Sequence, residues 1–87
     1  MKLKQGFYTQ SFRGKELLLA SGAAAEQFRG VARLSETAAF IVEHLKTDTT
    51  EAAVVAALLE AYNVTPELAA RDVRRIVEKL NEIGALE

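Results

Sequence analysis

TEAAVVAALLEAYNVTPELAARDVRRIVEKLNEIG, residues 50–84, is the stretch that decides the fold, because its apolar residues recur at helical spacing. Thr49 or Thr50 is a suitable N-cap for a first helix that runs to about Ala61, with valines and leucines along one side. Asn63 fits the left-handed position that commonly ends a helix. We therefore expect this helix to end just before Asn63.

A longer helix follows after a short connection. Thr65-Pro66 predicts its start, since threonine is a good cap and proline is favoured at the first helical position. The helix runs to about Ile83, and Gly84 stops it. Its predicted core stripe consists of Ala69, Val73, Ile76, Val77 and Leu80. Two helices joined by so tight a connection resemble a helix-turn-helix motif.

The residues before position 35 follow a shorter period. Residues 7–12 and 15–21 are predicted to form two strands. Arg13-Gly14 lies between them and suits a two-residue hairpin turn, in which glycine supplies a positive φ. Residues 30–34, GVARL, are a candidate third strand that starts at Gly30. These patterns together predict a small antiparallel sheet.

A further helix connects the two halves. Ser35 is a good N-cap for residues 36–46, whose apolar positions again have helical spacing. The predicted order is therefore three strands followed by three helices, which is typical of an α+β fold that is winged helix-turn-helix-like. With 87 residues and no linker-like segment, we expect residues 1–87 to form a single domain.

Composition excludes several classes of protein. There is no cysteine, so neither a disulfide framework nor a thiolate metal site is expected. The longest apolar run, residues 52–59, falls short of the roughly 20 residues that cross a bilayer, and the lysines at the start precede no signal-like apolar stretch. We expect a folded cytoplasmic protein outside the membrane. Its net charge is −1, divided between +4 in residues 1–34 and −5 in residues 35–87.

The chain offers little for catalysis. Its single histidine, His44, is predicted on the solvent side of its helix, with only Glu36 and Glu43 as nearby acids. No serine has a second base with which to form a triad, and no glycine-lysine signature of a phosphate loop is present. We therefore expect no enzymatic activity, no catalytic residue, no metal site and no cofactor.

The last helix carries a basic row. Arg71, Arg75 and Lys79 recur at four-residue spacing beside the apolar stripe, and Asp72 borders them. A basic row beside an apolar edge suits a groove that holds an acidic and apolar partner. The same pattern suits a solvated helix face whose arginines pair with neighbouring acids. Both interpretations stay open at this point.

The third strand is a second candidate binding element. A three-stranded sheet has two open edges, each with unpaired backbone N–H and C=O groups. The short segment 30–34 could accept an extended peptide as an additional strand. Its shortness and Arg33 could equally protect the edge against such pairing. The residues alone do not decide between the two.

Taken together and in their order along the chain, these motifs resemble those of the PqqD family, which is named for pyrroloquinoline quinone (PQQ) biosynthesis. Residues 28–41, FRGVARLSETAAFI, look like the part of that family in which a glycine-led third strand runs through a leucine into an Asn/Ser-Glu-Thr helix start. The opening Gly-Phe strand, the hairpin at Gly14 and the Thr-Glu helix start at Thr50 agree with it. The end of the chain agrees through Leu80, Gly84 and Leu86. The resemblance covers essentially the whole chain.

The resemblance implies a function. Proteins of this family resemble small winged helices and bind the leader segment of ribosomally made precursor peptides. The leader adds as a strand to the third β-strand, lies against the last helix, and is presented to a modifying enzyme, often a radical S-adenosylmethionine enzyme; the domain itself does no chemistry. The contacts implied by position are Gly30, Val31, Ala32, Arg33 and Leu34 on the strand and Arg71, Asp72, Arg75, Ile76 and Lys79 on the helix.

Two other functions are consistent with parts of the sequence. A winged-helix protein that binds nucleic acid would use the last helix as its reading helix, with Arg71, Arg74 and Arg75 at phosphates or bases. The ten acidic residues of the helical half oppose this alternative, because they leave little driving force from counterion release. The third possibility is a homodimer in which the open edge pairs with its own copy.

Overall fold

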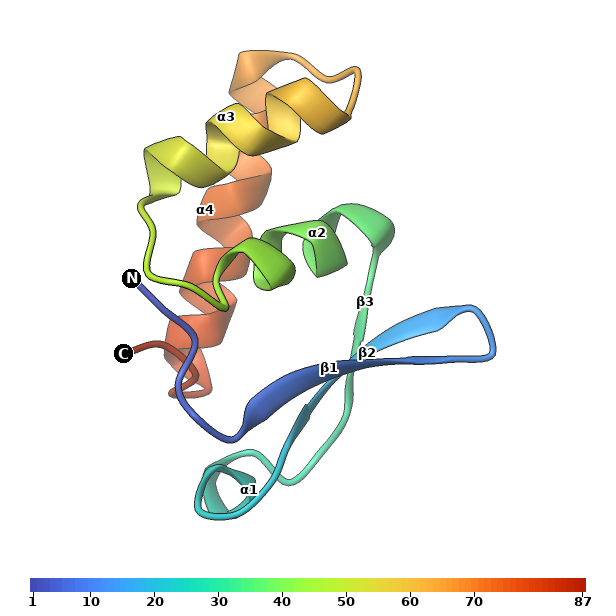
Figure 1. Cartoon of the computed structure of the whole chain (residues 1–87), viewed down its shortest axis with the longest axis vertical. Helices are drawn as coiled ribbons and strands as arrows, with labels where there is room; N and C mark the ends of the chain where they lie inside the picture. Colours follow the sequence, from blue (N-terminus) through green and yellow to red (C-terminus); the bar gives the residue numbers. More distant parts are fainter.

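The computed structural model describes all residues, 1–87, as an antiparallel sheet beside a group of helices (Figure 1). The elements in chain order are β1 (Phe7–Phe12), β2 (Lys15–Ala20), α1 (Ala24–Gln27), β3 (Ala32–Leu34), α2 (Glu36–His44), α3 (Glu51–Ala61) and α4 (Pro66–Glu82). The strand order in the sheet is β1-β2-β3, and both strand pairs are antiparallel. The predicted α+β architecture, three antiparallel strands followed by three long helices, is confirmed.

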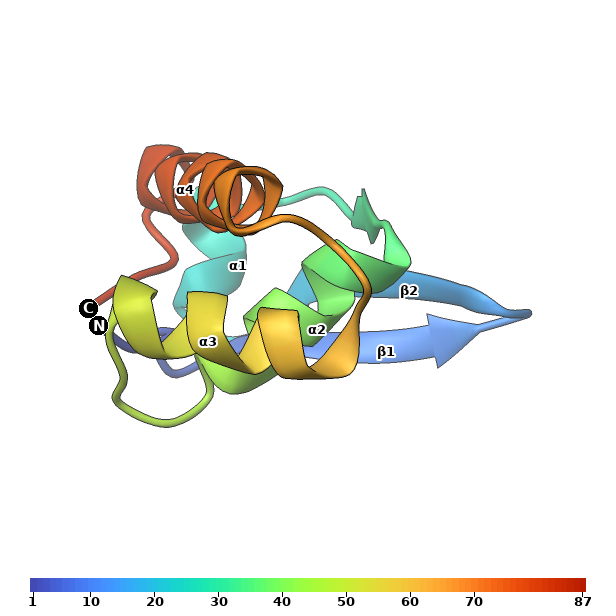
Figure 2. The ribbon, with the colours of Figure 1, turned by 90° about the horizontal axis from the view of Figure 1, so that it is seen from above.

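The β1–β2 hairpin forms as its turn residues predict. Phe12 pairs with Lys15 across a two-residue loop. Arg13 and Gly14 both have positive φ, 52° and 77°, which is the backbone of a type I′ turn. This turn matches the twist of the flanking strands, and the tip of the hairpin projects beyond the helices (Figure 2).

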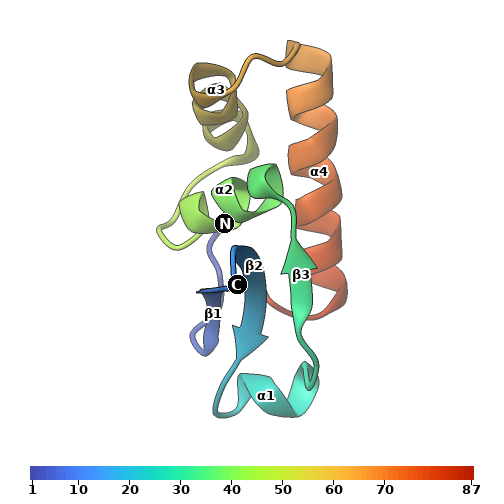
Figure 3. The ribbon, with the colours of Figure 1, turned by 90° about the vertical axis from the view of Figure 1, so that its right-hand side faces the viewer.

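The third strand is shorter than predicted. It begins at Ala32, so the expectation that it starts at Gly30 is wrong. The four-residue helix α1, which the sequence patterns did not predict, follows β2 and carries the chain away from the sheet. The chain returns through Gly30 and Val31 and pairs with β2 over only three residues. The small helix lies at the far end of the sheet from α2 (Figure 3).

The three long helices start where their caps predict. The side chains of Ser35, Thr50 and Thr65 accept hydrogen bonds from the backbone N–H groups of the third helical residues, at 3.1, 3.1 and 3.2 Å. These bonds satisfy donors that have no partner within the helix. Thr50, rather than Thr49, is therefore the cap of α3, and Pro66 occupies the first turn of α4.

The ends of the helices differ in one respect from expectation. Gly84 has φ of 73° and stops α4 as predicted. Asn63 does not adopt the left-handed conformation, so that prediction is wrong. Helix α3 instead ends because Tyr62 turns to an extended backbone, with φ of −130° and ψ of 149°. The ring of Tyr62 then packs edge-on against Phe40, with 5.4 Å between the ring centroids.

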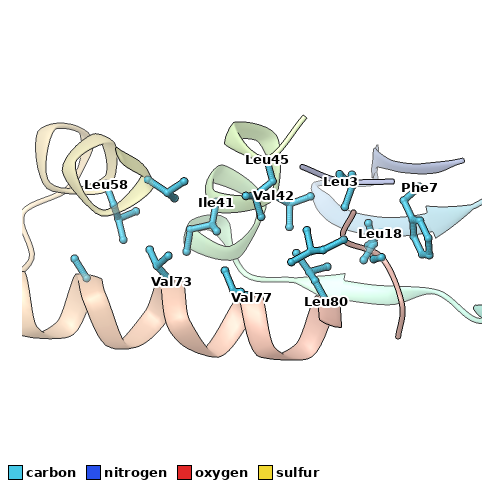
Figure 4. Close-up of a cluster of buried hydrophobic side chains, with 14 residues drawn as sticks. Leu3, Phe7, Leu18, Ile41, Val42, Leu45, Leu58, Val73, Val77 and Leu80 are labelled. Atoms are coloured by element: carbon cyan, nitrogen blue, oxygen red, sulfur yellow. The ribbon is translucent and has the colours of Figure 1, made fainter. Parts of the chain in front are cut away.

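One cluster of buried side chains joins the sheet to the helices (Figure 4). From α4 it receives Val73, Val77 and Leu80, which face α2, α3 and the sheet. Ile41 and Val42 of α2 lie at its centre and have no exposed surface. The other members of the cluster are Leu3, Phe7, Leu18, Leu45, Val54, Leu58, Ala69, Ala85 and Leu86.

The two ends of the chain lie side by side, which the sequence patterns did not indicate. Leu3 and Leu86 form an antiparallel bridge, and both are buried. Backbone bonds from Lys4 N to Ala85 O (2.7 Å) and from Glu87 N to Lys2 O (2.8 Å) flank it. The terminal segments thus close the core beneath the last turn of α4.

Helix α4 has 17 residues and is largely polar, and no helix of the structure has the length and apolar character needed to cross a bilayer.

Replacing Ile41 by alanine is expected to lower the free energy of unfolding by about 2–5 kcal/mol, because the side chain is fully buried and would leave a cavity. Urea denaturation followed by circular dichroism measures the loss. Leu68→Ala serves as the control, since that leucine is 39% exposed and its truncation is expected to cost under about 1 kcal/mol. Equal losses in the two variants would contradict the packing described here.

Candidate peptide-binding groove

A groove of about 390 Å³ runs between β3 and the C-terminal half of α4. The two elements lie alongside each other, with the strand at the edge of the sheet (Figure 3). No strand or helix closes the space between them, because α4 packs its buried row on α2 and α3. The groove is therefore a consequence of how α4 is placed by the core.

The floor of the groove is apolar. Its apolar lining comes from β2, the segment after α1, β3, α2 and α4, and consists of Leu18, Phe28, Ala32, Leu34, Ala38, Val42, Ile76, Leu80 and Ile83. Several of these side chains are only half-buried, notably Phe28, Ile76 and Ile83. An apolar side chain that covered them would remove their surface from water, worth about 25 cal/mol per Å².

Cations dominate the rim. Arg33 lies on the strand side, and Arg75 and Lys79 lie on the helix side, with Glu82 as the one acid of the lining. None of the three cations has an acidic partner within 4.0 Å. Arg74, one position along the helix, differs, because it pairs with both Glu51 and Glu78. The groove thus presents uncompensated positive charge beside an apolar floor.

The outer edge of β3 offers backbone groups for pairing. Phe12 and Lys15 face each other at the hairpin turn, so the backbone N–H and C=O of Lys15 point toward β1. The same groups of every second residue after Lys15 along β2 also point toward β1. Glu16 and Leu18 consequently bond toward β3, where they face Leu34 and Ala32. Arg33 lies between those two residues, so its N–H and C=O point away from the sheet. That outward pair can bond to an added strand.

The structure brings together six of the ten residues predicted for the site. Ala32, Arg33, Leu34, Arg75, Ile76 and Lys79 all line the groove. Ile76 was also predicted in the core stripe; it is half-buried, because it faces the groove rather than the centre of the molecule.

The other four predicted residues lie around the groove. Asp72 borders a small hollow at its upper end, which Arg75 and Ile76 share. Gly30 and Val31 line a separate hollow beside α1, and Phe28 borders both that hollow and the groove. Arg71 lines none of these spaces and lies 3.9 Å from Asp72.

Eight lining residues were not predicted for the site, namely Leu18, Phe28, Ser35, Ala38, Val42, Leu80, Glu82 and Ile83. Leu18, Phe28 and Val42 belong to elements on either side of β3, and Glu82 is on the last turn of α4. Nothing in their local sequence marks Leu18 or Val42 as groove residues, since both look like ordinary core positions. The spacing of Glu82, three residues after Lys79, was the one available signal.

A larger hollow adjoins the groove, since Arg33, Leu34 and Ser35 line both, and its lining includes Lys15 as well as several acids. Glu16, Glu36 and Glu43 border it, together with the aromatic pair Phe40 and Tyr62. Burial, and then the negative charge of Glu36, raises the pKa of the Tyr62 hydroxyl.

His44 is half-buried rather than fully exposed. Its ring stacks on Phe40 at 4.3 Å between centroids, and its Nδ1 lies 2.9 Å from the backbone O of Phe40. That contact fixes the ring against its own helix. No group of three or more His, Asp or Glu side chains is arranged to hold a metal ion.

Comparison with known proteins gives a consistent result. The family profile described as coenzyme PQQ synthesis protein D (PqqD) matches residues 18–86. A solved structure described as TbiB1 in complex with the TbiA(beta) leader peptide has 21% sequence identity and a TM-score of 0.78, and the match covers 100% of this chain and 95% of that one. A lasso peptide synthetase B1 complexed with the leader peptide has 27% identity and a TM-score of 0.73, with 97% and 93% covered. A search of curated protein sequences found no significant match.

Proposed function

The chain belongs to the PqqD family, and from that premise we propose that it binds the leader segment of a ribosomally made precursor peptide in the groove between β3 and α4. The observation that carries the proposal is the pairing of an open strand edge with an apolar, basic groove beside it. The two similar structures support it, because both are described as complexes with leader peptides.

The leader binds as an added strand. The outward N–H and C=O of Arg33 bond to its backbone, and Val31 continues the same edge beyond the ladder. Alternate side chains of an added strand point to opposite faces, so every second leader residue faces the apolar floor. Affinity then comes from backbone pairing and from one or two anchored apolar side chains.

The rim sets the preferred charge of the leader. Arg33, Arg75 and Lys79 have no acidic partners of their own, so acidic leader residues complement them. Such rim contacts mainly raise the association rate and fix the register of the peptide. The preferred ligand is an extended, acidic and apolar segment, which contacts Ala32–Leu34 on the strand and Arg75, Ile76 and Lys79 on the helix.

The domain acts as an adaptor that presents the peptide and does no chemistry of its own. Its partner is the enzyme that modifies the precursor, and a radical S-adenosylmethionine enzyme is the class that such proteins often serve. The complex forms in the cytoplasm, where precursor peptides leave the ribosome. Helix α3 and the N-terminal half of α4 lie away from the β1–β2 hairpin (Figure 1) and line no part of the groove, so they stay available while the groove is filled.

Nucleic-acid binding is the less favoured function. Of the three arginines that a reading helix would use, Arg74 is held by Glu51 and Glu78, and Arg71 lies beside Asp72. Arg75 faces the groove. The helix therefore presents mixed rather than uniform charge, which gives little attraction for phosphates.

Arg33→Pro is expected to bind the leader roughly tenfold more weakly than Arg33→Ala. Both variants lose the guanidinium, but only proline also removes the outward N–H, and it leaves the ladder with β2 intact. The measurement is fluorescence anisotropy with a labelled synthetic leader copied from the precursor gene nearest to the gene of this chain. Equal affinity of the two variants, with unchanged circular dichroism, would rule out strand addition at β3.

Arg75→Glu and Lys79→Glu are each expected to weaken the same leader roughly fivefold, and the loss should shrink at high salt because the contacts are exposed. Arg71→Glu is the matched control on the same helix face, since it lines no part of the groove. A loss with Arg71→Glu as large as with the other two would show that net charge matters and the groove does not.

A further inference from the structure

The sheet has a second open edge, formed by β1, that the leader does not use. Natural edge strands are usually protected by charged residues, proline or shortness. β1 has six residues, FYTQSF, with neither a charge nor a proline. Two of its aromatic side chains are exposed, Tyr8 by 40% and Phe12 by 55%. An edge of this length and composition is well suited to pair with another strand.

Along β1, the backbone N–H and C=O groups of successive residues point alternately toward β2 and out of the sheet. Phe12 bonds toward β2 at the hairpin end, and Gly6 O accepts from Ser21 N (2.8 Å) at the other end. Even-numbered residues of β1 therefore point their N–H and C=O toward β2. Thr9 and Ser11, which lie between them, point theirs out of the sheet.

We propose that β1 pairs antiparallel with β1 of a second copy of this chain, with the two-fold axis at Gln10. Thr9 then faces Ser11 of the second copy, and Ser11 faces its Thr9, so the outward N–H and C=O groups of all four residues bond to one another. Gln10 faces its own counterpart in a pair without backbone bonds, where the Cα atoms approach to about 4.5 Å.

The side chains complement one another in this register. Tyr8 faces Phe12 of the second copy on the sheet face that carries Leu17 and Leu19, and the contact occurs twice by symmetry. Both aromatic rings lose exposed surface, and both glutamine side chains can bond to each other. The nearest registers that keep outward groups paired are shifted by two residues and would place Tyr8 and Phe12 opposite Gln10 or a glycine, so the Gln10-centred register is the one that the sequence of β1 favours.

Charges beside the edge do not oppose a second copy. The Nζ of Lys46 lies 3.2 Å from the hydroxyl of Thr9, but it is also paired with Glu43 at 2.7 Å. The guanidinium of Arg13 lies over the ring of its own Phe12, 5.3 Å from the centroid. A second copy is the occupant that matches this edge, because the strand is uncharged and complementary to itself.

The dimer would be a continuous six-stranded sheet with β3 of each copy at its outer edges. Both grooves stay open, so one dimer carries two leader sites. The pairing is independent of the proposed leader binding, because it uses the opposite edge of each sheet.

Sedimentation equilibrium over about 1 µM to 1 mM chain tests the proposal. The mass is expected to rise with concentration from the 9.5 kDa of one chain to twice that value. Gln10→Lys should keep the protein at the mass of one chain, because two lysines would face each other at the axis. Ala56→Lys, on the exposed side of α3, adds the same charge away from the edge and should leave the dimer unchanged.

Mixing Gln10→Lys with Gln10→Glu gives the sharpest result. Each variant alone should stay at the mass of one chain, whereas an equimolar mixture should restore the doubled mass through opposite charges at the axis. A wild-type chain that keeps the mass of one chain at 1 mM would overturn the proposal. A mixture without the doubled mass, or wild-type assemblies larger than two, would overturn the Gln10-centred pairing.

Leader affinity of Gln10→Lys, measured by the same anisotropy assay, separates this proposal from the previous one. It should equal that of the wild type, because the groove lies at the other edge of the sheet. A leader that binds neither protein would count against the proposed function alone and would leave the sedimentation result to decide the pairing.

Discussion

The rest of the structure depends on the burial of one apolar row of α4. Val73, Val77 and Leu80 are almost wholly buried against Ile41 and Val42 of α2. Because the same cluster contains Leu18 of the sheet, the row also fixes how far β3 stands from α4. A chain of this size buries a modest share of its surface, so it has no second cluster with which to hold its parts. The core and the groove are therefore set by a single packing arrangement.

That arrangement leaves some apolar side chains partly exposed to water and some backbone hydrogen-bonding groups without partners. Ile76 and Ile83 lie beside the buried row but are only half-buried, because they face the groove. Arg33 has backbone groups directed outward, because no strand follows on that side. An extended peptide supplies both an apolar side chain and a backbone partner, so one ligand satisfies both surfaces. This coincidence is a stronger argument for peptide binding than the basic row by itself.

The sequence predicted what local chemistry controls. Side-chain caps at Ser35 and Thr65 and the positive φ of Gly14 follow from the residues themselves, and all are observed. Features that depend on distant residues were missed. Asn63 was expected to end α3, but the backbone is already extended at Tyr62, whose ring packs edge-on against Phe40. Such a contact between two helices cannot be deduced from either one.

The groove could be predicted only in part, because some of its residues follow from local patterns and others from contacts between distant elements. Helical spacing placed Arg75 and Lys79 on one face of the last helix, and strand order placed Ala32–Leu34 at an edge. The floor was not predictable, because Phe28 and Val42 reach it only through the placement of α1 and α2 around β3. Gly30 and Val31 fell outside the strand because α1 shortens the pairing with β2.

The two edges of the sheet differ in a way that suits different partners. β3 has three residues, one of them Arg33, and a groove beside it, so backbone pairing alone gives little and a partner must also fill the groove. A second copy of β3 would place Arg33 near its own counterpart and leave both grooves empty, which disfavours self-pairing at that edge. β1 has twice as many residues and no charge, so a strand that matches it along its length gains the most backbone pairing. The short charged edge therefore selects a peptide with the right side chains, and the long uncharged edge selects a strand like itself.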